Sequence, residues 1–175
     1  MTVVADAGPL IALAKIGGLQ ALFQLFSTVS IPPAVNNEAI RIGRDRRAAD
    51  ALLLEEAFHA GRLKLAVPQA SPLPIAAQLG RGEEETILLA IERNAEWALL
   101  DDFAARQAAA LSFQSAEVPT RVKGTLGVIA SAFRVGHLSL EEAVGLVTRI
   151  RARPDIWIHE RLCQQAIDAL HGFRS

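Results

Sequence analysis

Short apolar segments alternate with longer helical segments along most of this chain, and this alternation is the feature that most limits how it can fold. The segment "TVVAD" at 2–6 has the pattern of a buried strand, and Pro9 then opens a helix that two glycines end at 17–18. "TVSIP" at 28–32 repeats the pattern, with Pro33 opening the next helix. Strands that alternate with helices at this spacing predict an α/β domain with a mostly parallel sheet.

The rest of the chain extends this pattern and then changes to helices alone. We expect a single domain over residues 1–175, with a helix-rich C-terminal portion from about 126 and a linker-like segment, rich in Pro and Gly, at 67–82. The further elements predicted are strands at 63–67, 97–100 and 116–122 and helices at 34–43, 47–61, 82–95, 103–110, 124–136, 140–153 and 158–172.

The composition of the chain limits where the protein acts and what it can bind. The net charge of −1 leaves any nucleic-acid contact to a local patch. The single cysteine, Cys163, cannot form an internal disulfide, and the N-terminus lacks the pattern of a signal peptide. No apolar stretch is long enough for a membrane span, so we predict a cytoplasmic protein with no membrane partner. Aromatic residues make up only 5% of the chain, which predicts little stacking of nucleic-acid bases.

Acidic residues follow two of the predicted strands. Asp6 ends the first strand, and the adjacent Asp101 and Asp102 end the strand at 97–100. In open parallel sheets, ligands bind beyond the carboxyl ends of the strands, so these positions indicate a site. Two neighbouring aspartates repel each other unless something offsets their charge.

Two glutamates lie on the apolar faces of predicted helices. Glu38 shares a face with Val35 and Ile42, and Glu83 shares one with Ile87. Glu85 is two residues further on, about 200° around the helix, so we prefer Glu83 and keep Glu85 as a second choice.

Several buried carboxylates in one place are costly unless a cation neutralises them. Oxygen ligands of this kind suit Mg²⁺ or Mn²⁺. Such an ion could activate water and stabilise charge during in-line attack on a phosphodiester. We therefore predict one group of residues with both catalytic and metal-binding roles: Asp6, Glu38, Glu83, Asp101 and Asp102.

At these residues the sequence resembles the PIN domain family, and within it the toxins of bacterial and archaeal type II toxin-antitoxin modules. The matching stretches are "VVADAGPLIALAKIG", "VSIPPAVNNEAI", "LGRGEEETILLAIERNAEWALLDDFAAR" and "VKGTLGVI". The resemblance implies a three-layer α/β sandwich with a mostly parallel central sheet and helices on both faces. It also implies metal-dependent endoribonuclease activity on RNA, a homodimer and a small antitoxin protein that blocks the site.

The sequence departs from this family at two places. Related sequences often carry a hydroxyl residue shortly after the first aspartate, whereas Ala7 and Gly8 stand here, so a supporting hydrogen bond must come from elsewhere. Asn36 and Asn37 precede the helix glutamate, where less polar or more acidic neighbours are expected.

Three other hypotheses remain open. The acidic residues can each be turn or helix caps. A phosphoryl-accepting receiver domain also groups acids at strand ends and could use Lys123, but it gives Glu38 no role. A non-catalytic PIN-like interaction module would suit the missing hydroxyl, and it would not need to bind metal.

Several single residues have weaker signals. The arginines at 41–47 could contact RNA phosphates or form a solvated helix end. Thr125 could bond to an acidic residue, but a helix cap is the interpretation that we prefer. We expect Trp97 and Trp157 to be packing residues, unless one is exposed as an interface anchor, and Cys163 to lie in the core.

Overall fold

The computed structural model describes residues 2–69 and 79–173, which leaves most of the linker-like segment at 67–82 outside the described residues. Five short strands form one sheet in the order β3-β2-β1-β4-β5, and every neighbouring pair is parallel. This confirms the predicted parallel α/β fold. The strands are β1 (Val3–Ala5), β2 (Val29–Ile31), β3 (Leu63–Leu65), β4 (Trp97–Leu99) and β5 (Arg121–Lys123).

Helices cover both faces of the sheet. Successive residues of a strand point to opposite sides, so both faces carry apolar side chains that the helices bury. In β1, Val3 and Ala5 belong to a core cluster that includes Leu10, whereas Val4 belongs to a second cluster that includes Ile87. The helices are α1 (Ala7–Ile16), α2 (Leu19–Leu25), α3 (Pro33–Asn36), α4 (Gly43–Asp45), α5 (Ala49–His59), α6 (Arg81–Glu92), α7 (Phe103–Ser115), α8 (Thr125–Arg134), α9 (Leu140–Arg151) and α10 (Glu160–Gly172).

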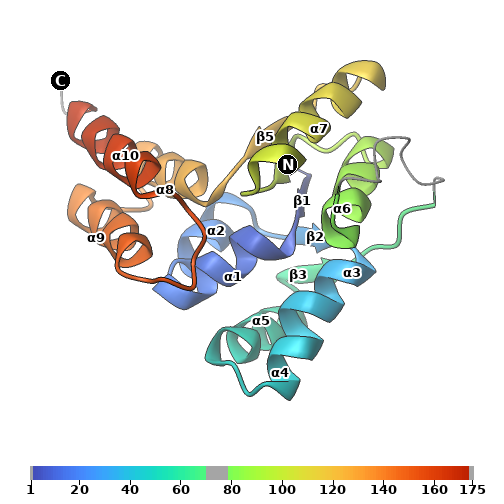
Figure 1. The fold of residues 1–175 in the computed structure, drawn as a ribbon, viewed down its shortest axis with the longest axis horizontal. Helices are drawn as coiled ribbons and strands as arrows, with labels where there is room; N and C mark the ends of the chain where they lie inside the picture. Colours follow the sequence, from blue (N-terminus) through green and yellow to red (C-terminus); the bar gives the residue numbers. More distant parts are fainter. Residues whose placement is uncertain (1, 70–78, 174–175) are drawn as a thin grey trace.

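The C-terminal helices gather on one side of the molecule. Figure 1 shows α8, α9 and α10 together, with α6 and α7 on the opposite side. Cys163 of α10 is fully buried, so the expectation that it lies in the core is confirmed. None of the helices within the described ranges is long and apolar enough to cross a membrane.

The predicted helix at 34–43 differs from a regular α-helix. The chain passes from α3 into a π-helical stretch, η1 (Asn37–Ile42), and then into α4. A π-turn holds more residues per turn than an α-helix, so it changes the direction in which the following side chains point. Such turns are frequent at functional sites, and this one contains Glu38.

The strand order reverses beside β1. The chain first builds outward from β1 through β2 to β3, and then returns to place β4 and β5 on the other side of β1. The connections that leave β1 and β4 therefore diverge and open a crevice beyond the carboxyl ends of these strands. The fold brings the residues that follow β1 and β4 together at that crevice.

Candidate active site

All five acidic residues selected from the sequence line one pocket at this crevice. The pocket has a volume of about 510 Å³. Its acidic side comes from the ends of β1 and β4, from η1 and from the first turn of α6. These lining residues are Asp6, Glu38, Glu83, Asp101 and Asp102.

Asp6 joins the end of β1 to the start of α1. Its backbone N–H donates to the Leu99 carbonyl at 3.0 Å, which holds the ends of β1 and β4 together. Its carboxylate caps α1 by accepting the Gly8 N–H at 3.3 Å. Burial raises the pKa of Asp6 to about 6, and the charges of Glu38 and Glu83 add to this rise. Asp6 therefore caps α1, as the capping hypothesis predicts, and also lines the pocket.

Asp101 is held by the first residue of α8. The Thr125 N–H donates to one carboxylate oxygen at 2.7 Å, and the Thr125 hydroxyl donates to the other at 2.6 Å. Burial raises the pKa of Asp101, while these bonds and the charge of Arg106 oppose the rise. The preferred interpretation of Thr125 as a cap is wrong, because Gly124 is the N-cap of α8 and the hydroxyl bonds to an acid 24 residues earlier in the chain.

The adjacent aspartates Asp101 and Asp102 have different partners. Asp102 is the N-cap of α7, and its carboxylate accepts the Ala105 N–H at 2.8 Å. Thus one carboxylate is turned toward the start of α8 and the other toward the start of α7, where backbone N–H groups favour negative charge. This arrangement allows two like charges to stand side by side.

Glu83 and Gly82 bring the first turn of α6 against the other acids. The Glu83 carboxylate accepts the Gly80 N–H at 2.8 Å, and burial, followed by the charges of Asp102 and Glu38, raises its pKa. A Cβ atom on Gly82 would lie 3.0 Å from an Asp6 oxygen and 3.6 Å from a Glu38 oxygen. The absence of a side chain at Gly82 therefore lets the helix approach both acids.

Glu85, the second choice in α6, is not among the residues that line the pocket. Its carboxylate accepts the Ala34 N–H at 2.8 Å and pairs with Arg81 at 2.9 Å. It therefore ties the start of α3 to α6.

Two basic side chains considered for the site, those of Lys123 and Arg44, contact other residues and do not line the pocket. Lys123 donates to Ser131 at 2.6 Å and lies 3.8 Å from the centre of the Trp97 ring, and it does not line the pocket. This position does not suit the lysine of a receiver domain. Arg44 pairs with Glu55 at 2.8 Å, also away from the pocket.

The sequence analysis missed several residues that line the pocket, among them Lys15, Asp155 and Trp157. Lys15 lies at the end of α1 and pairs with Asp155 at 2.9 Å, although the two residues are 140 positions apart. Trp157 is 96% exposed, so the expected packing role is wrong for it and the exposed position kept as the alternative is found. A single lysine at a helix end and a single tryptophan after a proline gave no sequence signal for this pocket.

The donor set fits a hard divalent cation. Carboxylate oxygens are preferred by Mg²⁺ and Mn²⁺. The raised pKa values of Asp6, Glu83 and Asp101 reflect the cost of keeping their negative charges out of water, which a cation would offset. Within the described ranges, no group of three or more His, Cys, Asp or Glu side chains is placed so that it could hold a metal ion.

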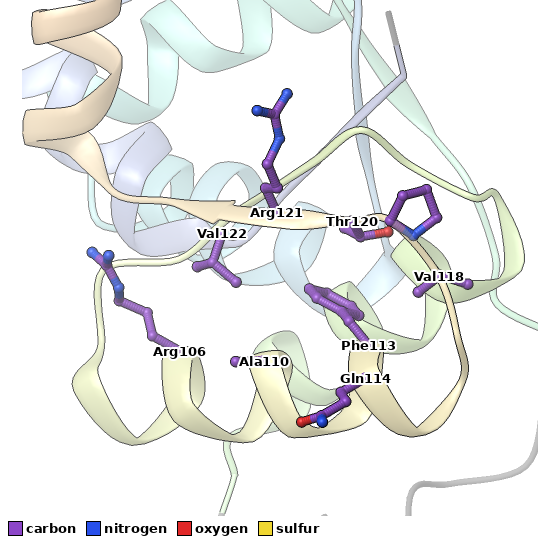
Figure 2. A pocket seen from close by; sticks show the side chains of 9 residues that line it. Arg106, Ala110, Phe113, Gln114, Val118, Thr120, Arg121 and Val122 are labelled. Carbon is purple, nitrogen blue, oxygen red and sulfur yellow. The ribbon is translucent and has the colours of Figure 1, made fainter.

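A second hollow of about 540 Å³ lies between α7 and the edge strand β5. Figure 2 shows Val122 and Phe113 facing this hollow, while Arg121 points to the other side of the strand. None of its described lining residues is acidic, so it lacks the ligands that a divalent cation requires.

Without metal, the protein is expected to lose stability between about pH 5 and 7.5. The pKa of Asp6 is about 6 in the folded chain and 3.8 for a fully solvated aspartate, so the folded state binds the proton more tightly. The resulting stabilisation is complete below the lower value and is lost as the pH rises through the higher one. For Asp6 alone, the free energy of unfolding should fall by about 1 kcal/mol over this interval.

Urea unfolding in EDTA at these two pH values measures the effect. Glu83 and Asp101 contribute with the same sign, because burial raises their pKa values too. The variant Asp6→Asn should lose the Asp6 part of the pH dependence. An unchanged dependence in this variant would contradict the assignment to Asp6.

Comparison with known proteins bears on what this pocket does. A family model described as PIN domain matches residues 2–171. No curated protein and no solved structure matches the chain.

Proposed function

The chain belongs to the PIN domain family, whose members are generally nucleases, and from this premise we propose that it is a divalent-metal-dependent endoribonuclease. The observation that carries the proposal is the meeting of five carboxylates in one pocket at the carboxyl ends of β1 and β4. A pocket with this much negative charge would repel the phosphates of RNA unless cations were bound in it.

The residues that would hold Mg²⁺ or Mn²⁺ are Asp6, Glu38, Glu83, Asp101 and Asp102. Such an ion supplies Lewis acidity and positive charge for hydrolysis of a phosphodiester. The other residues orient these ligands. The Gly80 N–H holds Glu83, and Thr125 fixes both oxygens of Asp101.

The test is cleavage of a mixed RNA pool by the purified protein in Mg²⁺ or Mn²⁺, with EDTA as the metal-free condition. We expect cleavage with metal and none with EDTA. The change Glu83→Gln should abolish most of the activity. The matched control is Glu85→Gln, which makes the same change in the same helix but outside the pocket, and it should retain activity.

Two outcomes would reject this function. Equal activity in EDTA and in metal would show that the carboxylates do not act through a cation. Absence of both cleavage and calorimetric metal binding would favour the non-catalytic interaction module, which keeps the fold without the chemistry.

We further propose that the nuclease is the toxin of a type II toxin-antitoxin module, forms a homodimer and is blocked by a small antitoxin protein. Large apolar side chains are exposed on the C-terminal portion, and a protein partner would cover them. They include Val135, Leu162 and Phe173. Expression of the wild type should arrest growth and expression of Glu83→Gln should not, which would support the toxin role. The dimer is tested by light scattering, where a monomer would contradict it.

A further inference from the structure

The loop between α9 and α10 presents an aromatic side chain to the acidic pocket. Trp157 lies in this loop, lines the pocket and is 96% exposed. An indole is a large apolar group, and its burial away from water is favourable in free energy. The exposed Trp157 ring does not gain this stabilisation in the chain alone. Trp97 shows the contrast, because the Arg121 guanidinium and the Lys123 ammonium lie over its ring at 4.1 and 3.8 Å.

The loop is held in place on both sides of the indole. Before it, Asp155 pairs with Lys15 and with Arg153, each at 2.9 Å. The neighbouring side chain of Ile156 is only 9% exposed, and Ile158 packs against the same core cluster. Ile156 is buried in the core and Ile158 is partly buried against it, so the backbone is anchored on both sides of Trp157 while its ring stays exposed.

The pocket has two chemically different sides. One consists of the carboxylates, and the other contains the apolar side chains of Ile11, Ile156, Trp157 and Ile158. A nucleotide has the matching division, with an anionic phosphate and a flat base whose faces are apolar. A phosphate held at the carboxylates would lie in the same pocket as these apolar residues, and an adjoining base could contact them.

We propose that Trp157 is a substrate-positioning residue that stacks on a base of single-stranded RNA next to the bond to be cleaved. This inference rests on the proposed ribonuclease function and adds a residue that positions the substrate. A base within a duplex has both faces covered by its neighbours, so an unpaired strand is required. Every base has a π-face, so the contact itself selects no sequence.

Kinetics of three variants test the role of the ring. With a short single-stranded RNA and Mn²⁺, Trp157→Ala should raise KM by about 5- to 150-fold and change kcat less, as expected for loss of one stacked base. Trp157→Phe should recover most of the affinity. The matched control Leu111→Ala removes another exposed large apolar side chain, on α7 and outside the pocket, and should leave KM unchanged. Thermal unfolding should be the same in Trp157→Ala and the wild type, because the ring is exposed.

A second measurement does not depend on cleavage. The same RNA, added in Mg²⁺, should quench indole emission in the wild type and not in Trp157→Phe. Replacing one base of the RNA by an abasic ribose should weaken wild-type binding at one position along the strand and leave Trp157→Ala unaffected at that position.

The outcomes separate this inference from the proposed function. Cleavage with an unchanged KM in Trp157→Ala would overturn the stacking role and leave the nuclease intact. Quenching without cleavage would support the stacking role and reject catalysis. If Trp157→Ala dissociated a dimer while RNA affinity stayed the same, the ring would be an interface between two copies, and the inference would be wrong.

Discussion

Replacement of Asp6 by asparagine is expected to lower the rate of RNA cleavage more than about 100-fold, because loss of even the outer partners of metal ligands commonly costs 10- to 100-fold. Asparagine is also a good N-cap, so the start of α1 should be preserved. It carries no charge, so it removes the burial cost that raises the pKa of Asp6 to about 6. The metal-free variant should therefore be at least as stable as the wild type at neutral pH.

Steady-state kinetics and urea unfolding in EDTA measure the two effects together. Asp168→Asn is the matched control, since Asp168 is exposed on α10 and does not line the pocket. Activity near the wild-type level in Asp6→Asn would remove Asp6 from the proposed chemistry. A clear loss of metal-free stability would mean that its charge is needed for folding.

The second large effect is expected at Thr125, through its hold on Asp101. The change Thr125→Val keeps the shape of the side chain and removes the hydroxyl that donates to Asp101 at 2.6 Å. One carboxylate oxygen then loses its partner, and the free energy of unfolding should fall by about 1–3 kcal/mol near neutral pH. The pKa of Asp101 should rise further, and cleavage should slow by about 10- to 100-fold.

Thr125→Ser provides the comparison, because serine retains the hydroxyl and the backbone N–H bond to Asp101 is common to all three proteins. The stability loss in Thr125→Val should shrink at acid pH. Asp101 is protonated there, and a neutral carboxyl group loses less free energy than a carboxylate when a hydrogen-bond donor is removed. A loss of equal size at every pH would indicate a packing defect in place of the predicted electrostatic effect.

The general fold could be predicted from the sequence because most strands are apolar and several helices begin or end at Pro or Gly. The positions of Asp6 and Asp101 followed from the same pattern, since both stand directly after an apolar run. The strand order could not be predicted. Placing β4 beside β1 depends on tertiary packing of segments more than 90 residues apart.

The details of the pocket depend on contacts that no local pattern contains. In "KGTLG" the threonine has the pattern of a helix cap, and only the approach of α8 to the end of β4 gives its hydroxyl an acid to bind. The π-turn at η1 likewise occurs within a run that reads as an ordinary helix. The exposed position of Trp157 depends on the anchoring of its two neighbours in a core built by other segments.

The ion pair between Lys15 and Asp155 also has a consequence for the order of biosynthesis. The acids through Asp102 are translated first, but three of the four apolar residues on the opposite side of the pocket are added only when residues 155–158 are made. Because chains grow from the N-terminus at about 5–20 residues per second, the acidic side precedes the apolar side by seconds. A partly made chain can thus contain every proposed metal ligand and still lack Trp157, and under the proposed function this would delay the stacking of a base until residues 155–158 have left the ribosome.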